Sequence, residues 1–292
     1  MGSATDTTVE DAINTGAIEG RVNTDDGGIN VGGLIGSMNN SHLIGNSYNL
    51  GDVTSIGSNV GGLVGSATNS VIGNKADTDT EETELVYNRM DVTGAYNVGG
   101  IVGNMVGSTV RNAENSGTVE ATGYTTEDYT YHTAHYNDNE NYTVDNVFAA
   151  NAGGIVGNSS NNSTITDVLN TADVSSSQQS GNDYYDAGNV GGIVGKAVDT
   201  NITNATNQEN EIRGAHNVGG IAGYFGNSSD DSSQDYTVTN GINDGGDIMA
   251  TGARNAIGFV QEWVRAGDTG GEQTIVGNMG GIVAVSYTHL RA

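Results

Sequence analysis

The stretch from Asn59 to Gly65 reads Asn-Val-Gly-Gly-Leu-Val-Gly, and close copies of it run through the whole chain of 292 residues. Such a phrase repeated at a near-fixed period indicates stacked units rather than one closed globule. The near-minimal unit is about 28 residues, and longer gaps between copies read as one unit plus an insertion. The eight copies open at Asn30, Asn59, Asn97, Asn151, Asn189, Asn217, Asn255 and Asn278, with more substitutions in the copies at Asn151, Asn255 and Asn278.

A second phrase precedes most copies, and it runs Val or Ile, four variable residues, then Asn-x-Gly-x-Val or Ile, as in Ile44 to Val53. In the unit that starts at Ile72, we assign the asparagine position to Asp77, and an acidic insertion follows it. Each unit then holds three short apolar segments, such as those around Val53, Leu63 and Ile72. Short β-branched segments between turn residues predict strands.

These observations predict an all-β fold, a parallel β-helix or β-solenoid of about eight coils with loop insertions. The absence of proline agrees with this, because proline would remove a hydrogen bond from a strand ladder. Asparagine tolerates left-handed backbone, and stacked amides bond to one another. We therefore expect a structural ladder at one corner, made by Asn30, Asn59, Asn97, Asn151, Asn189 and Asn217.

The faces of the phrase are ambiguous, because strict alternation puts Val60 and Val64 on one side of the strand and Leu63 on the other. We favour Leu63 inside with the smaller residues outside. The alternative is a second layer, or a partner, over the valine face. In either case Leu34, Leu63, Ile101, Ile155, Ile193 and Ile221 should stack in one internal column.

The Gly-Gly-Leu-Val-Gly phrase with its Asn-x-Gly-x-Val partner resembles the GLUG-motif repeats of bacterial and archaeal surface proteins, over residues from about Val9 to Val283. Such repeats occur in adhesin-like proteins and beside the catalytic domain of some IgA-specific metallo-endopeptidases. The resemblance implies an extracellular stalk or display module. It transfers no catalytic residue, since the zinc motif His-Glu-x-x-His is absent from this chain.

The chain carries 35 acidic and 9 basic residues, for a net charge of −26. This charge disfavours nucleic acid and anionic membranes as direct partners. There is no cysteine and no apolar run long enough for a membrane span, so neither disulfides nor direct membrane insertion is expected. A cell-surface or secreted protein would need a secretion signal, and the residues after Met1 do not resemble one.

We therefore interpret residues 1–284 as a single solenoid domain, a fragment of a longer protein that lacks its signal and its anchor. Residues 285–292, Val-Ser-Tyr-Thr-His-Leu-Arg-Ala, break the repeat abruptly. They match the translation of a transposon sequencing adapter, which indicates a metagenomic fragment, and we leave them out of the functional reasoning.

The longest insertion, roughly Tyr124 to Val147, is the candidate binding region. It holds five tyrosines among acids and amides, a composition typical of adaptable recognition surfaces. Its expected partner is a host-cell or matrix protein or a glycan, although a self-packed polar loop is the simpler interpretation. The candidate binding residues are Tyr124, Tyr129, Tyr131, Tyr136 and Tyr142.

Metal chemistry has only weak candidates. An alternating pattern like that of calcium ligands is formed by Asp77, Asp79 and Glu81, but the glycine and final glutamate of an EF-hand loop are missing. The segment is interpreted either as a weak Ca²⁺ site or as a solvated run of charges. His132 and His135 lack the helical setting of a zinc pair. The stretch from Asn255 to Ala266 is interpreted as a degenerate coil. Its sole tryptophan, Trp263, is interpreted as a core residue. No cofactor is expected.

The sequence thus predicts a non-catalytic extracellular scaffold, an adhesin-like stalk that displays its insertions. The alternative is a polysaccharide-active parallel β-helix enzyme, a lyase or hydrolase with carboxylates gathered in a groove. We expect no aligned carboxylate pair in adjacent coils, and the few arginines are scattered along the chain. These two features favour the scaffold.

Overall fold

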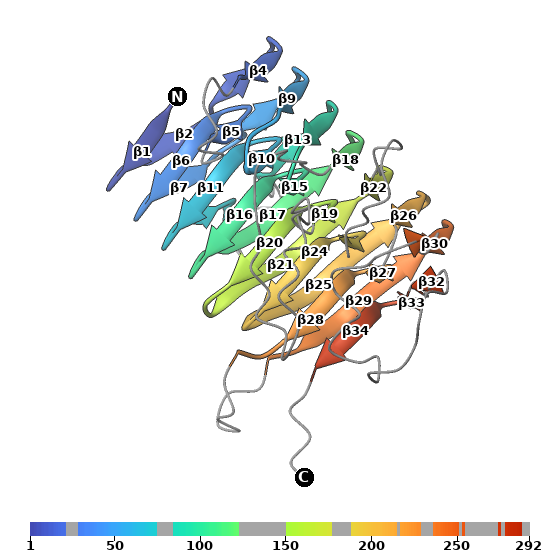
Figure 1. Cartoon of the computed structure of the whole chain (residues 1–292). Coiled ribbons are helices and arrows are strands. Elements are labelled where there is room, and N and C mark those ends of the chain that lie inside the picture. The colour runs from blue at the N-terminus through green and yellow to red at the C-terminus, as the bar shows by residue number, and fades with distance from the viewer. Residues whose placement is uncertain are drawn as a thin grey trace, which may run out of the picture.

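The computed structural model describes residues 1–21, 29–74, 84–122, 150–176, 188–214, 217–228, 236–250, 253–254, 274–275 and 278–287. Every helix or strand assigned in these residues is a strand, and strands of successive coils pair in parallel into four sheets. Figure 1 shows the coils stacked from the N-terminus to the C-terminal end. The predicted all-β parallel solenoid is therefore confirmed.

Two of the four sheets come from the repeated phrase. The eight-stranded sheet, called sheet A here, is made by β1 (Ser3–Thr5), β6 (Ile35–Asn39), β11 (Val64–Thr68), β16 (Val102–Val106), β20 (Val156–Ser160), β24 (Val194–Val198), β28 (Ala222–Gly226) and β34 (Val283–Tyr287). A seven-stranded sheet, sheet D, is made by β5 (Asn30–Gly32), β10 (Asn59–Gly61), β15 (Asn97–Gly99), β19 (Asn151–Gly153), β23 (Asn189–Gly191), β27 (Asn217–Gly219) and β33 (Asn278–Gly280).

The second phrase supplies the other two sheets. The ten-stranded sheet B is made by β2 (Thr8–Glu10), β3 (Ile13–Asn14), β7 (His42–Ile44), β8 (Tyr48–Asn49), β12 (Val71–Ile72), β13 (Val86–Asn88), β17 (Thr109–Asn115), β21 (Ser163–Asn170), β25 (Thr200–Gln208) and β29 (Val238–Asp244). The seven-stranded sheet C is made by β4 (Ile18–Gly20), β9 (Val53–Ser55), β14 (Val92–Gly94), β18 (Val119–Ala121), β22 (Val174–Ser176), β26 (Ile212–Gly214) and β30 (Ile248–Ala250).

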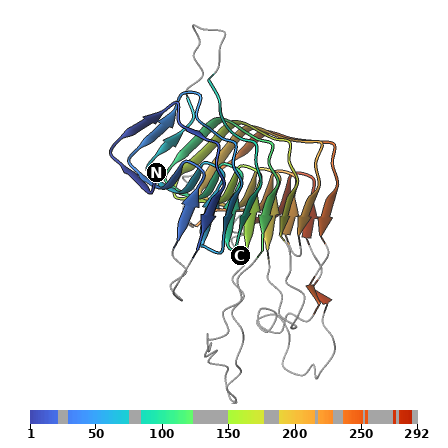
Figure 2. The ribbon, with the colours of Figure 1, turned by 90° about the horizontal axis from the view of Figure 1, so that it is seen from above.

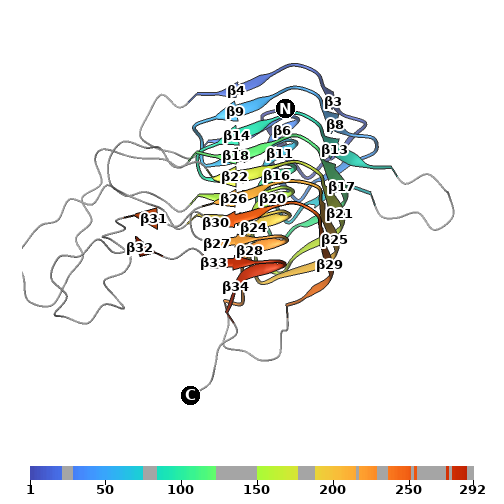
Figure 3. The ribbon, with the colours of Figure 1, turned by 90° about the vertical axis from the view of Figure 1, so that its right-hand side faces the viewer.

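Each coil visits sheets A, B, C and D in that order, and Figure 3 shows the strands of sheets B and C as two separate columns. The prediction of three strands per coil is therefore wrong. The repeated phrase bends at Gly62 and Leu63 and gives one strand to sheet D and the next to sheet A. At this bend the N–H groups of Leu63 and Val64 both donate to the carbonyl oxygen of Ile101, at 3.0 and 2.9 Å.

The glycines of the phrase are required by this bend. A Cβ atom on Gly62 would lie 2.1 Å from the oxygen of Gly100 and 2.5 Å from Cγ of Asn88. A Cβ on Gly65 would lie 2.5 Å from the nitrogen of Val31, because sheet D packs directly against the backbone of sheet A. Backbone approach this close leaves room for glycine alone.

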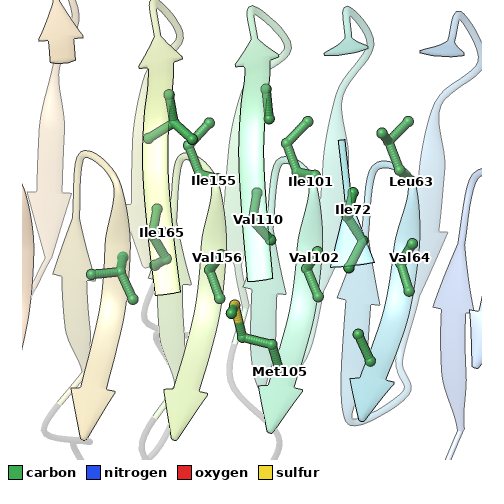
Figure 4. Packing of buried hydrophobic residues seen from close by; sticks show 14 of the residues in the cluster. Leu63, Val64, Ile72, Ile101, Val102, Met105, Val110, Ile155, Val156 and Ile165 are labelled. Atoms are coloured by element: carbon green, nitrogen blue, oxygen red, sulfur yellow. The ribbon is translucent and has the colours of Figure 1, made fainter. Parts of the chain in front are cut away.

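The interior contains two apolar cores. The larger lies between sheets A and B, and Figure 4 shows Leu63, Ile101 and Ile155 repeating through it from coil to coil. The N–H of each of these residues donates to the carbonyl oxygen of its counterpart in the next coil. The predicted column is confirmed, with its six members buried: Leu34, Leu63, Ile101, Ile155, Ile193 and Ile221.

The smaller core lies between sheets C and D, where Val60 packs in one cluster with Val53 and Val92. Both Val60 and Val64 are fully buried, so the favoured interpretation that left them outside is wrong. The bend breaks the strict alternation, and sheet C covers the side of sheet D that carries Val60. The second layer considered from the sequence is thus part of the same chain.

Figure 2, which views the stack from above, shows successive coils following one another along one direction. In sheet D, β27 pairs directly with β33, in the register Asn217 to Asn278. The worn copy at Asn255, including Trp263, lies outside the described residues. A short antiparallel pair, β31 (Ala253–Arg254) and β32 (Thr274–Ile275), flanks that segment in the sequence.

Candidate functional site

The asparagines that open the repeated phrase form one hydrogen-bonded ladder along the stack. From Asn59 onward, Nδ2 of each residue donates to Oδ1 of its counterpart in the preceding coil, at 2.7–2.8 Å. Because neighbouring amides pair in this way, the buried members keep a donor and an acceptor engaged. The ladder contains the predicted residues Asn30, Asn59, Asn97, Asn151, Asn189 and Asn217.

A second ladder is formed by the asparagine of the second phrase, and it runs in the opposite direction. Here Nδ2 of each member donates to Oδ1 in the following coil, at 2.7–2.9 Å. Its described members are Asn14, Asn49, Asn88, Asn115, Asn170, Asn207 and Asn243. The assignment of this position to Asp77 is wrong, since Asn88 holds it and the acidic insertion precedes β13 instead of following the asparagine.

A third ladder is made of hydroxyl groups at the corner between sheets A and B. The N–H groups of Ser41, Ser70 and Ser108 donate to the Oγ of the serine in the next coil, at 3.0–3.1 Å. Each Oγ donates in turn to a nearby carbonyl of its own coil, and the serines are buried. We did not predict this ladder, although a serine stands two residues before the buried apolar residue in each of these coils.

Left-handed backbone occurs at other positions than the ladders. Among the described ladder asparagines none has a positive φ. Positive φ values occur instead at corner residues such as Asn40 (47°) and Asn69 (48°), and within strands of sheet B, as at Asn204 (50°) in β25. The ladder asparagines are therefore explained by amide pairing and, in the second ladder, by bonds from Nδ2 to the carbonyl oxygen two residues further on, as from Asn49 to Gly51.

Several predicted site residues lie outside the described residues. These are the five tyrosines Tyr124, Tyr129, Tyr131, Tyr136 and Tyr142, the acidic triplet Asp77, Asp79 and Glu81, and the histidines His132 and His135. Their strands of attachment are described. The tyrosine insertion connects β18 to β19, and the acidic insertion connects β12 to β13.

Most of the variation in length falls at the corner from sheet C to sheet D. The connection is short after β9 and β14, spanning residues 56–58 and 95–96. At the same corner it is extended to residues 21–29, 122–150, 177–188 and 251–277 in other coils. The insertions therefore interrupt equivalent positions of the stack and leave the paired strands in register.

The structure corrects one prediction about charge. The residue before each strand of sheet C forms a column in which Asp52 neighbours Asp91, while Asp173, Glu211 and Asp247 follow one another in successive coils. Oδ1 of Asp91 accepts the N–H of Thr118, and Oδ1 of Asp173 accepts the N–H of Glu211. Carboxylates do align in adjacent coils, because this position recurs in the second phrase. Within the described residues no group of three acids or histidines could hold a metal ion.

A stacked aromatic pair on sheet B was missed from the sequence. The rings of Tyr48 and Tyr87 are 4.7 Å apart at 6°, and the guanidinium of Arg89 lies 4.8 Å from the centre of the Tyr87 ring. The sequence contains a signal for this pair, because a tyrosine directly precedes an asparagine of the second ladder in both Tyr48-Asn49 and Tyr87-Asn88.

Few electrostatic perturbations accompany these arrangements. The hydrogen bond from Arg21 to Glu19, at 2.8 Å, lowers the pKa of the Glu19 carboxyl and raises that of Arg21. Desolvation, and then the negative charge of Asp199, raise the pKa of Tyr236. Neither pair belongs to a cleft or to a set of converging catalytic groups in the described part of the chain.

Comparisons with protein family models, with curated proteins and with solved structures found no match. The resemblance to GLUG-motif repeats therefore stays a prediction. Across the described residues, no helix has the length and apolar character needed to cross a membrane.

Proposed function

We propose that this chain is a non-catalytic extracellular scaffold, an adhesin-like stalk that displays its insertions on a cell surface. The observation that supports the proposal most is the uniformity of the coils. The same register repeats along the strands of sheet D, so these strands encode little individual specificity. The insertions, by contrast, differ in length and sequence from coil to coil.

The corner between sheets C and D supports a display role. Insertions of unrelated length replace one short connection while the strands on both sides stay paired. Solenoids tolerate such insertions because each coil contacts only its neighbours. We assign contact with a host-cell or matrix protein, or a glycan, to the Tyr124 to Val147 insertion, with Tyr129, Tyr131 and Tyr136 as anchors.

The net charge of −26 suits a hydrated surface outside the cell and repels nucleic acid. Calcium is the one ion we retain as a weak ligand, at Asp77, Asp79 and Glu81. A Ca²⁺ titration at matched ionic strength tests this, and a melting temperature that does not respond to Ca²⁺ would exclude the site.

A polysaccharide-active enzyme is the second candidate, favoured by the aligned carboxylates Asp173, Glu211 and Asp247 with Arg213 two residues after Glu211. These carboxylates stand in one row, whereas glycoside hydrolysis needs two carboxyl groups on opposite sides of the scissile bond.

One experiment separates the two functions. Beads coated with the chain are tested for adhesion to cells, and the soluble chain is incubated with polyuronides. The scaffold predicts adhesion that disappears when residues 124–147 are removed, without release of reducing or unsaturated ends. Cleavage that is lost in the variants Asp173→Asn and Asp247→Asn would establish the enzyme instead.

A further inference from the structure

The outer face of sheet B carries a compact group of side chains in the first three coils, which we call the Tyr48–Tyr87 patch. It consists of Ile13, Tyr48, Leu50, Tyr87 and Arg89. The register pairs Ile13 with Tyr48 and Tyr48 with Tyr87, so these three form one row along the axis. Figure 3 shows β3, β8 and β13 as neighbours in this sheet.

The rings point away from the core. Tyr48 stands between Ser47 and Asn49, both fully buried, and alternation along a strand turns the residue between them outward. Ile13 and Leu50 keep 55% and 37% of their surface exposed, although they are large apolar residues. The patch therefore presents apolar surface to solvent on a rigid sheet.

The polar groups of the patch are unused within the described residues. The hydroxyls of Tyr48 and Tyr87 make no hydrogen bond there, and the guanidinium of Arg89 makes no ion pair there despite the excess of acids in the chain. Arg89 instead lies over the Tyr87 ring, which holds its planar fork in place with its N–H donors available. Two hydroxyls and one guanidinium are thus fixed beside apolar surface.

We propose that the Tyr48–Tyr87 patch binds a neutral glycan. A sugar offers apolar C–H faces beside hydroxyl groups, which matches side chains that combine an apolar body with a polar tip. The net charge of −26 and the acid Glu114, which pairs with Tyr87 in the strand register, disfavour an anionic ligand. A protein partner requires about 20–30 residues on each side of a standard interface, which is far more than this patch provides.

This proposal rests on the extracellular role proposed above and adds a second contact, on the coils themselves. Its structural rival is that the tyrosines only reinforce the strand ladder, as cross-strand aromatic pairs do. The double variant Tyr48→Phe with Tyr87→Phe separates the two, because it keeps the rings and removes the hydroxyls. Leu169→Ala is the matched control, since Leu169 occupies the same outward row two coils beyond Tyr87.

The test is calorimetric titration of the full chain with neutral gluco-, manno- and galacto-oligosaccharides and with one oligouronate. We expect binding of at least one neutral oligosaccharide, weakened about tenfold in the double phenylalanine variant. The melting temperature of that variant should stay unchanged, and Leu169→Ala should bind as the unaltered chain does. Absence of neutral-glycan binding at millimolar concentration, preference for the uronate, or undiminished binding by the phenylalanine variant would overturn the proposal.

Two further results distinguish this proposal from the display function. Glycan binding that disappears only when residues 124–147 are deleted would overturn the patch and leave the display role standing. Cell binding that needs the tyrosine hydroxyls but survives enzymatic removal of cell-surface glycans would identify a protein partner and overturn the glycan assignment. Polyuronide cleavage would contradict the scaffold and leave the patch to be judged by its own titration.

Discussion

Nδ2 of Asn97 donates a hydrogen bond of 2.8 Å to Oδ1 of Asn59, and the backbones of these two residues pair in the same register. In the other asparagine ladder, Nδ2 of Asn88 donates to Oδ1 of Asn115, in the opposite direction along the stack. Each interior coil is thus tied to both of its neighbours by each ladder, and the donors of the two ladders point in opposite directions along the stack. The amide pairs fix the register that the uniform strands alone would leave weakly specified.

Replacing Asn97 by leucine should destabilise the chain, because Oδ1 of Asn59 loses its donor and Nδ2 of Asn151 loses its acceptor. Leaving one buried and one partly buried amide unsatisfied should lower the free energy of unfolding by about 2–4 kcal/mol. Thr93→Ala, on the outer face of sheet C, is the control and should change it by less than about 0.5 kcal/mol. Equal urea midpoints for the two variants would refute the role of the ladder.

Gly62→Ala should prevent normal stacking, since the added Cβ would lie 2.1 Å from the oxygen of Gly100. The chain offers a matched control in Gly281, which holds the same place in the last copy of the phrase and has nothing within 4 Å of a Cβ. Gly281→Ala should therefore melt like the unaltered chain, while Gly62→Ala should lose several degrees or fail to fold. Thermal melting followed by circular dichroism compares them, and equal tolerance would contradict the packing.

The column of carboxylates should make stability depend on salt. Asp52 and Asp91 occupy equivalent positions in adjacent coils, about 4.8 Å apart along the axis. Asp52→Asn should raise the melting temperature in dilute buffer, and the gain should vanish near 1 M NaCl, where the Debye length is about 3 Å. A gain that is the same at low and high salt would show that the effect is not electrostatic repulsion.

Tyr236 should contribute to unfolding in alkali. Burial and Asp199 raise its pKa above the ordinary value of 10.0 in the folded chain. The folded state therefore binds the phenolic proton more tightly than the unfolded state, so this stabilisation is complete below pH 10 and is lost as the pH rises towards the folded pKa. Tyr236→Phe should flatten the fall in melting temperature above pH 10, and an unchanged alkaline profile would contradict this.

The fold class could be predicted because the repeated phrase recurs with the residues that stacking requires. The structure gives each of three residues in this phrase a role. Asn59 forms an amide pair, Gly62 lies too close to its neighbours for a Cβ atom, and Leu63 belongs to the buried column. The number of strands could not be predicted in the same way. The bend at Gly62 hides the boundary between two sheets inside one apolar run.

The candidate surfaces were harder to predict, since outward residues obey no repeat. Tyr48 and Tyr87 lie far apart in the sequence and meet only because an insertion in β12–β13 leaves the coil register intact. That insertion also displaced the assignment of the ladder position from Asn88 to Asp77. Where an insertion interrupts the repeat, the sequence no longer shows which residues are equivalent. The strand pairing in the structure identifies them.

The central claim is that the coils fold and remain stable without the insertions, which the scaffold displays. Its most direct test is the thermal melting of a chain that lacks residues 124–147, in which β18 runs to β19 through a short connection like that between β14 and β15. Shortening a loop changes its closure entropy only slightly, so we predict a cooperative transition within a few degrees of the full chain. A transition that is lost, or lowered by more than about 10 °C, would show that the insertion holds the fold together and would contradict the scaffold.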